Sequence, residues 1–176
     1  MEQLTIEVRP PGELEPDALA IPFPEEDGAA LSNGTRALDE RLNGRLQRLV
    51  EDGELKGELG KTVLLHTDGE LDARRLIVAG VGKREEVDAD ALRTAAAAVV
   101  RRLADVGGSV AWQLDDSLPL SLDDQARAIV EGTMLGSYSP ARWKTEEKPR
   151  KLVEKVVLYT DAPDGLAESA GRIARV

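Results

Sequence analysis

The sequence predicts an α/β protein with a three-layer α/β/α architecture and a mixed, mostly parallel sheet. Short apolar segments typical of strands alternate along the chain with longer amphipathic segments typical of helices, a pattern found where helices cover both faces of a parallel sheet. The 176 residues are enough for one domain with a sizeable core. The hydrophobic content of 41% and charged content of 32% are those of a folded globular chain.

Two strands are predicted near the N-terminus. Residues 4–8 alternate apolar and polar side chains, as a half-buried strand does, and prolines follow directly. Residues 18–21 form a short apolar run bounded by Pro16 and Pro22, which predicts a short buried strand.

One amphipathic helix is predicted over about 35–51. Asn33 and Thr35 offer capping side chains at its start, and four leucines then recur at helical spacing. These leucines are Leu38, Leu42, Leu46 and Leu49. The charged, glycine-rich residues 52–61 that follow predict a loop.

The middle of the chain predicts two strands and the clearest helix. Residues 62–66 form a strand, and residues 76–82 contain no polar side chain, as expected of a strand covered on both faces. Asp88 is placed to cap a helix that ends near Gly107. Its apolar stripe consists of Leu92, Ala96, Val99, Leu103 and Val106.

A strand, a helix and a last strand are predicted in the final third. Residues 110–114 and 153–159 are the strands, and the helix runs from about Ser121 to Gly136. This helix carries Leu122, Ala126, Ile129, Thr133 and Met134. Residues 166–176 have the pattern of an opening amphipathic helix, which either docks on the sheet or leads into another domain.

Charge and residue content exclude several classes of function. The chain carries 23 basic and 33 acidic residues, a net charge of −10 that disfavours binding to nucleic acid. It has no cysteine and one histidine, which excludes disulfide scaffolds, thiol nucleophiles and zinc sites built from cysteines or several histidines. No signal peptide pattern and no apolar run of membrane-spanning length are present, so we expect a cytoplasmic protein without membrane contact.

A glycine-rich turn at the end of the strand over 76–82 is a weak candidate phosphate loop. Gly80 and Gly82 stand where a strand hands over to a helix, and backbone N–H groups there can bind an anion. The third glycine of a dinucleotide fingerprint is replaced by Glu85, and neighbouring acids would repel phosphate. A packing or turn role for both glycines is the favoured interpretation.

His66 and a basic island, residues 142–155, are the remaining candidate functional sites. The single imidazole ends a predicted strand without a nucleophile-elbow serine in the chain, so a partly exposed structural histidine is expected. Residues 142–155 carry six basic and three acidic side chains in an otherwise acidic chain. They are interpreted as a solvated loop, with a contact to a partner surface or another subunit as the alternative.

Two segments resemble the N-terminal domain of the cytosolic leucyl aminopeptidases, the M17 metallopeptidase family. One is the strand over 75–83 followed by the helix that opens at Asp88. The more specific one matches the pattern E-G-x-x-L-G-x-Y followed by an aromatic–Lys pair. Its residues here are Glu131, Gly132, Leu135, Gly136, Tyr138, Trp143 and Lys144. The resemblance covers essentially the whole chain.

The resemblance implies that catalysis takes place outside this chain. In the family, a larger C-terminal domain holds two divalent metals, zinc or manganese, which activate water for peptide hydrolysis. Its hallmark, Asn-Thr-Asp-Ala-Glu-Gly-Arg-Leu, is missing here, so no catalytic residue and no metal ligand is assigned in this chain, and no cofactor is expected in this domain. The implied partners are the chain's own catalytic domain and further copies of itself, because the family forms hexamers.

The resemblance also implies domain limits and a fold. Residues 1–162 are expected to form a macro-domain-like unit, and residues 163–176 the start of an interdomain helix, with the catalytic domain absent. Tyr138, Arg142, Trp143 and Lys144 are expected to contact the catalytic domain or a neighbouring subunit. The alternative function is a stand-alone macro-like module that binds ADP-ribose or another nucleotide, and a nucleic-acid role through the basic island is a third possibility.

Overall fold

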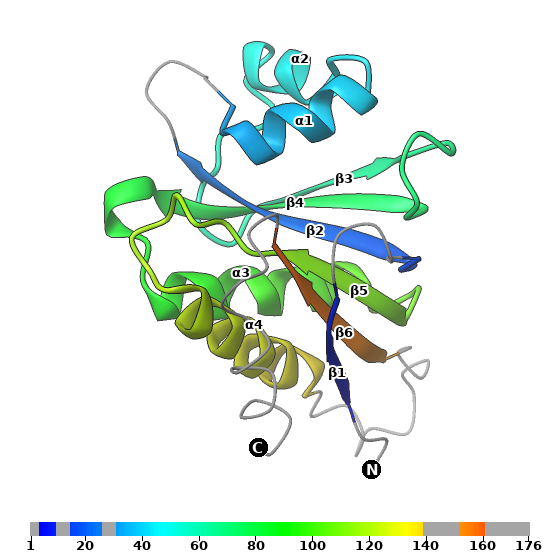
Figure 1. Cartoon of the computed structure of the whole chain (residues 1–176), viewed down its shortest axis with the longest axis vertical. Coiled ribbons are helices and arrows are strands. Elements are labelled where there is room, and N and C mark those ends of the chain that lie inside the picture. Colours follow the sequence, from blue (N-terminus) through cyan, green and yellow to red (C-terminus); the bar gives the residue numbers. More distant parts are fainter. Residues whose placement is uncertain (1–3, 10–14, 26–30, 139–151, 161–176) are drawn as a thin grey trace, which may run out of the picture.

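The computed structural model describes residues 4–9, 15–25, 31–138 and 152–160. They form a six-stranded sheet in the order β1-β6-β5-β2-β4-β3, with helices on both faces (Figure 1). The strands are β1 (Thr5–Val8), β2 (Ala18–Glu25), β3 (Thr62–His66), β4 (Arg75–Lys83), β5 (Gly108–Gln113) and β6 (Val153–Tyr159). The helices are α1 (Asn33–Arg41), α2 (Arg45–Glu51), α3 (Ala89–Arg102) and α4 (Leu122–Ser137), with a short 3-10 helix, η2 (Arg84–Glu86).

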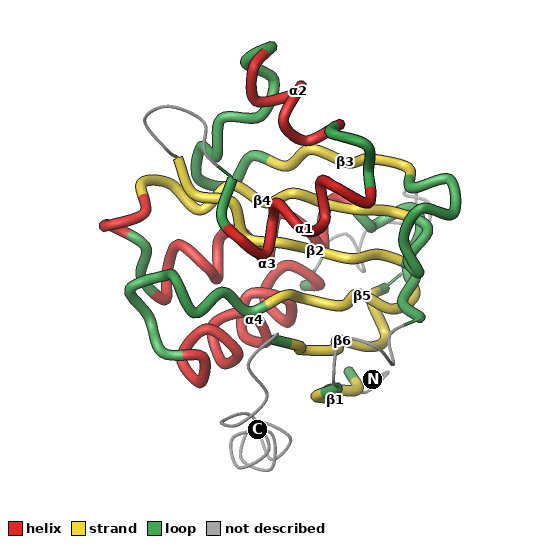
Figure 2. The backbone as a smooth tube through the Cα atoms, turned by 45° about the horizontal axis from the view of Figure 1, so that its top comes forward, coloured by secondary structure: helices red, strands yellow, loops and turns green. Residues whose placement is uncertain are grey.

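The sheet is mixed and mostly parallel, as predicted. Strands β1, β6, β5, β2 and β4 pair with their neighbours in parallel, and only β3 runs antiparallel, beside β4 at one edge. Figure 2 shows this order along the sheet, with β1 and β3 at opposite edges. All six predicted strands are present in the described residues.

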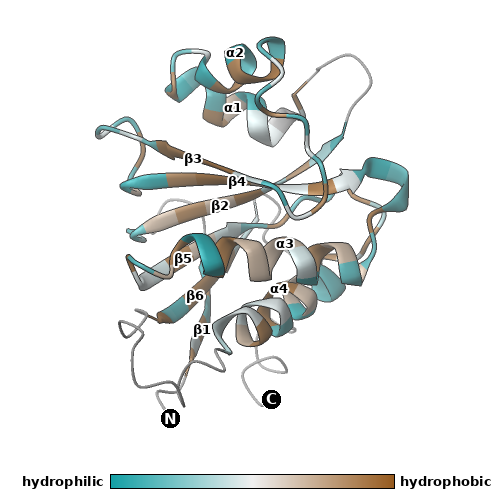
Figure 3. Cartoon of the chain, turned by 180° about the vertical axis from the view of Figure 1, so that it is seen from behind, coloured by the Kyte–Doolittle hydropathy of each residue, from teal (hydrophilic) through white to brown (hydrophobic). Residues whose placement is uncertain are grey.

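Each face of the sheet carries its own apolar core. Helices α3 and α4 pack on one face, where the core includes Ile77, Trp112 and Val156 (Figure 3). Helices α1 and α2 lie on the opposite face, where Leu42 and Leu46 pack with Val78 and other strand residues. Residues 76–82 of β4, which carry no polar side chain, are buried along most of their length because they contribute side chains to both cores.

Strand β2 is longer than the sequence indicated. It continues through Pro22 to Glu25, although Pro22 was expected to end it. Strand β5 pairs with β2 only over Ala18–Ala20, so the ladder on that side has already ended where the proline lacks a donor. Pairing with β4 on the other side carries the strand on.

The single helix predicted over 35–51 is wrong, because the chain forms two helices there. Asn43 and Gly44 both have positive φ angles, 54° and 75°, which interrupt the helix between α1 and α2. Asp39 stabilises the break, since its buried carboxylate accepts a hydrogen bond of 2.7 Å from the N–H of Leu46. The first helix is capped by Ser32, one residue before the predicted cap Asn33.

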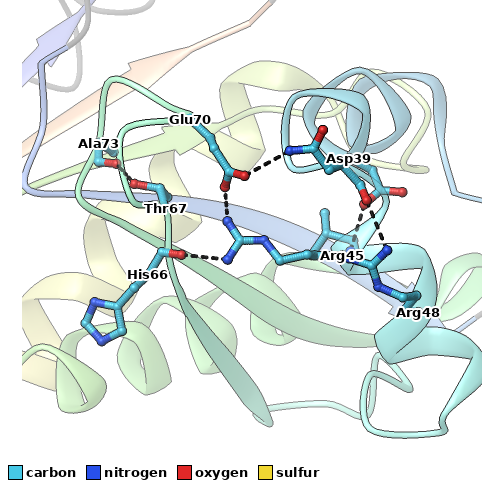
Figure 4. Close-up of polar contacts among 9 residues, drawn as sticks. Asp39, Arg45, Arg48, His66, Thr67, Glu70 and Ala73 are labelled. Atoms are coloured by element: carbon cyan, nitrogen blue, oxygen red, sulfur yellow. Dashed lines mark hydrogen bonds and ion pairs between the residues drawn. The ribbon is translucent and has the colours of Figure 1, made fainter.

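A polar cluster fixes this break to the turn between β3 and β4 (Figure 4). The Arg45 guanidinium forms an ion pair with Glu70 and donates to the backbone oxygen of His66 at 3.1 Å. The Asn43 side chain donates to the same Glu70 carboxylate at 3.0 Å. These contacts join α2 to an edge of the sheet, so the cluster has a clear structural role.

Both long helices begin where the sequence predicts. Asp88 accepts a hydrogen bond from Ala91 N at 2.8 Å, and Ser121 accepts one from Asp124 N at 3.2 Å. Of the residues named for the second helix, Thr133 is fully buried and Met134 is 49% exposed. In the described part of the chain, no helix has the length and apolar character needed to cross a membrane. The helix predicted over 166–176 lies outside the described residues.

Candidate functional site

Gly80 and Gly82 lie at the end of β4, against the segment 57–61. Gly80 donates its N–H to the oxygen of Lys61 at 2.8 Å and accepts a hydrogen bond from Gly60 N at 3.0 Å. Gly82 donates its N–H to the oxygen of Gly57 at 2.9 Å. The two donors that a phosphate would use therefore already have partners within the chain.

The close approach of this segment explains why residue 80 is a glycine. A Cβ atom at Gly80 would lie 2.0 Å from the backbone oxygen of Glu58, a distance that no side chain can occupy. Gly82 has a φ of 80°, in the left-handed region that favours glycine. The geometry fits the packing interpretation of this turn.

The glycines of the E-G-x-x-L-G-x-Y segment hold α4 directly against α3. A Cβ atom at Gly132 would lie 2.4 Å from the backbone oxygen of Arg93, and one at Gly136 would lie 2.8 Å from the Cα of Ala97. The facing side of α3 is correspondingly rich in alanine, including the buried Ala96. Small residues on both helices allow the backbones to approach closely, so these two positions of the motif serve helix packing.

The glutamate of the same segment adds an ion-pair network to this helix pair. Glu131 on α4 accepts a hydrogen bond of 2.6 Å from Arg93 on α3, and Arg93 also contacts Asp90 at 2.6 Å. The hydrogen bond that Arg93 donates to Glu131, followed by the one it donates to Asp90, raises the pKa of the Arg93 guanidinium. The side chains are partly or largely exposed, so the network contributes little to stability.

The last turn of α4 and the residue that follows it expose three large apolar side chains. Leu135 is 67% exposed, Tyr138 76% and Met134 49%. Tyr138 was predicted as a contact residue, whereas Met134 and Leu135 were not. Arg142, Trp143 and Lys144, predicted with Tyr138, lie outside the described residues, as does most of the basic island.

His66 lies at the exposed end of β3, and only its backbone oxygen takes part in the polar cluster. Among the described residues, no group of three His, Cys, Asp or Glu side chains is placed to hold a metal ion. Gly80 is buried in β4, His66 lies at the exposed end of β3, and Tyr138 follows α4, so the sequence candidates belong to three separate parts of the fold.

A cavity of about 190 Å³ lies between α1 and the sheet. Its lining includes Leu19 from β2, Leu38 and Arg41 from α1, and the strand ends Gln113 and Tyr159. Arg41 stands 3.6 Å from Asp72 and is half exposed. Sequence reasoning missed this cavity because five separate segments form it, and no local pattern marks such an assembly.

The family of the chain follows from comparison with known proteins. The model for the cytosol aminopeptidase family, N-terminal domain, matches residues 20–147. The chain belongs to this family. A probable cytosol aminopeptidase of Geotalea uraniireducens is 42% identical over 131 residues, which cover 72% of this chain and 26% of the relative. The chain thus spans about a quarter to a third of the length of the curated relatives it matches.

Solved structures support the fold. A tomato leucine aminopeptidase mutant superposes with a TM-score of 0.72 at 20% identity, covering 98% of this chain and 35% of that one. The macrodomain of Mycobacterium tuberculosis DarG superposes with a TM-score of 0.62 at 15% identity, covering 91% of this chain and all of that one. At these identities the likeness concerns the fold alone, and it confirms the macro-domain-like architecture.

Proposed function

We propose that this chain is the non-catalytic N-terminal domain of a metal-dependent leucyl aminopeptidase, which removes N-terminal residues from peptides. The observation that carries the proposal is the family match over 20–147, together with relatives of which the chain spans only 26% to 32%. The remaining length of such a relative leaves room for a separate catalytic domain.

In this proposal the domain braces the catalytic domain and supports assembly of a hexamer in the cytoplasm. Two divalent ions, zinc or manganese, would be held outside the 176 residues, where they would polarise the peptide carbonyl and activate water. The part of this chain is mechanical, because the close α3–α4 pair and the two-sided core give a rigid body. Tyr138, Arg142, Trp143 and Lys144 are its proposed contacts with the catalytic domain or a neighbouring subunit.

The alternative is a macro-like module that binds ADP-ribose or another nucleotide. The resemblance to the DarG macrodomain favours it at the level of fold. The hydrogen bonds already formed by the N–H groups of Gly80 and Gly82 count against a phosphate site there. Calorimetry with ADP-ribose separates the two proposals, since the aminopeptidase proposal predicts no heat of binding.

The coding sequence and the intact protein test the leading proposal. We expect the coding sequence to continue beyond Val176 into an Asn-Thr-Asp-Ala-Glu-Gly-Arg-Leu stretch. We expect the intact protein to hydrolyse leucine p-nitroanilide with manganese or zinc, and to lose this activity when a chelator removes the metal. A stop codon directly after Val176, or an intact protein that is inactive with both metals, would contradict the proposal.

A further inference from the structure

The last turn of α4 presents an apolar surface to solvent. Met134 and Leu135 lie on the exposed side of this turn, and Tyr138 directly follows the helix; these three residues are here called the α4 patch. Earlier turns of the same side carry exposed charged residues, among them Asp123, Asp124 and Arg127. The change from charged to apolar residues is confined to the end of the helix, where contiguous apolar exposure marks an interaction surface.

The patch is held in a fixed position. Gly132 and Gly136 bring the opposite side of α4 into backbone contact with α3. Thr133, which lies between them in the sequence, is fully buried. Figure 3 shows both helices lying together on one face of the sheet. A helix packed this closely cannot rotate to bury Met134 or Leu135, so α4 keeps both side chains on its outer side.

We propose that the α4 patch docks against the catalytic part of the same polypeptide. This inference rests on the proposed function and names the surface that joins the two domains. Leu135 and Met134 would enter an apolar depression, and the Tyr138 ring would pack at its rim with its hydroxyl on a hydrogen-bond partner. Tyr and Met are enriched at such contacts because they combine large contact area with adaptability.

The size of the patch favours a contact within one chain over a contact between copies. A stable interface between separate proteins buries about 800 Å² on each partner, from about 20–30 residues a side. Within the described residues the patch has three side chains, which fall far short of that area. Two domains on one chain need less, because the linker keeps them at about millimolar effective concentration.

Hydroxyl-radical footprinting of the intact protein and of the 176-residue chain tests the proposal. Met134 and Tyr138 should be labelled readily in the 176-residue chain, where they are 49% and 76% exposed. Their labelling in the intact protein should fall roughly fivefold, as expected when exposed side chains become the core of an interface. Leu59, which is 50% exposed in the segment that packs on β4, is the internal control and should be labelled equally in both.

Matched variants provide a second readout. The double variant Leu135→Ser with Tyr138→Ser should lower the Tm of the intact protein and leave the Tm of the 176-residue chain within about 2 °C, as surface substitutions do. Leu59→Ser should leave both unchanged. Equal labelling of Met134 and Tyr138 in both proteins, with an unchanged Tm of the intact variant, would overturn the proposal.

A contact of the α4 patch with a second copy of the chain would give a different footprinting result. Labelling of the 176-residue chain that falls as its concentration rises would show that a second copy covers the patch. Protection in the intact protein that disappears on dilution to monomers would assign the contact to a neighbouring subunit. Either result overturns docking within one chain but leaves the aminopeptidase function intact, since that is measured separately by peptide hydrolysis.

Discussion

At the scale of single residues, Asp17 and Ser109 join the starts of β2 and β5. The Asp17 carboxylate accepts hydrogen bonds from the N–H and the hydroxyl of Ser109, both at 2.9 Å, and the hydroxyl accepts one from Asp17 N at 3.0 Å. The preceding Gly108 leaves room for this contact, because a Cβ there would lie 2.4 Å from the carboxylate. The pair joins residues 92 positions apart in sequence.

The Asp17 carboxylate should make the stability of the folded domain depend on pH. The backbone hydrogen bond from Ser109 is the main cause that lowers the pKa of Asp17 in the folded state. A lowered carboxylate pKa stabilises the fold above the unfolded pKa of about 3.9, and this contribution disappears as the pH falls through the folded value. Asp17→Asn should therefore lose about 1 kcal/mol of unfolding free energy near pH 7.

Urea unfolding at several pH values measures this difference. The gap between wild type and Asp17→Asn should shrink steadily below about pH 4, where the wild-type carboxylate also becomes neutral. The exposed Asp116, changed to Asn, is the control and should show no comparable gap. A gap of constant size from neutral to acid pH would contradict the role given to the Asp17 charge.

The sequence predicts contacts between neighbouring residues better than contacts between residues far apart in the chain. The caps Asp88 and Ser121 were evident because each bonds the backbone three residues further on. The Asp17–Ser109 pair and the ion pair between Arg93 and Glu131 gave no local signal, because each depends on segments that meet only in the folded chain.

At the scale of elements, the α3–α4 pair is the best-defined unit of the domain. The apolar stripes of both helices were predicted, and their register against each other was not. That register follows from Gly132 and Gly136, whose missing side chains admit the backbone of α3. In this chain the two glycines of the family pattern therefore allow close helix packing, whereas its leucine and tyrosine, Leu135 and Tyr138, are exposed to solvent.

Gly132→Ala should destabilise the domain despite the higher helix propensity of alanine. The propensity gain is about 1 kcal/mol, whereas forcing a methyl group into the backbone of Arg93 costs about 1–3 kcal/mol and moves the helices apart. We expect a net loss of about 1 kcal/mol in urea unfolding. Leu135→Ala, on the exposed side of α4, should stay within about 0.5 kcal/mol of wild type. A Gly132→Ala variant more stable than wild type would refute the close packing.

The break between α1 and α2 yields a second test at this scale. The regular spacing of leucines predicted one helix, but the Asn43-Gly44 dipeptide, a turn signal in the same sequence, decides the outcome. Gly44→Ala should cost about 1 kcal/mol, because an alanine at a φ of 75° is strained. Gly44→Asn should cost less, since asparagine tolerates the left-handed region. Thermal unfolding compares them, and equal losses would show that backbone strain is not the cause.

At the scale of the whole molecule, the alternation of strands and helices was sufficient to predict the layered, mostly parallel sheet. The order of the strands in the sheet could not be predicted from the sequence, because the contacts that place β2 between β5 and β4 leave no local pattern. The candidate sites were predicted least well. Gly80 has the close packing that its sequence interpretation favoured, whereas the exposed end of α4 was only partly foreseen, through Tyr138.

The central claim is that this domain is part of a peptidase but contains none of its catalytic residues or metal ligands. The most direct measurement compares leucine p-nitroanilide hydrolysis by the isolated 176-residue chain and by the intact protein, both supplied with manganese. We expect metal-dependent turnover by the intact protein and none above the buffer rate by the isolated chain, while circular dichroism shows that chain folded. Chelator-sensitive turnover by the isolated chain would contradict the claim.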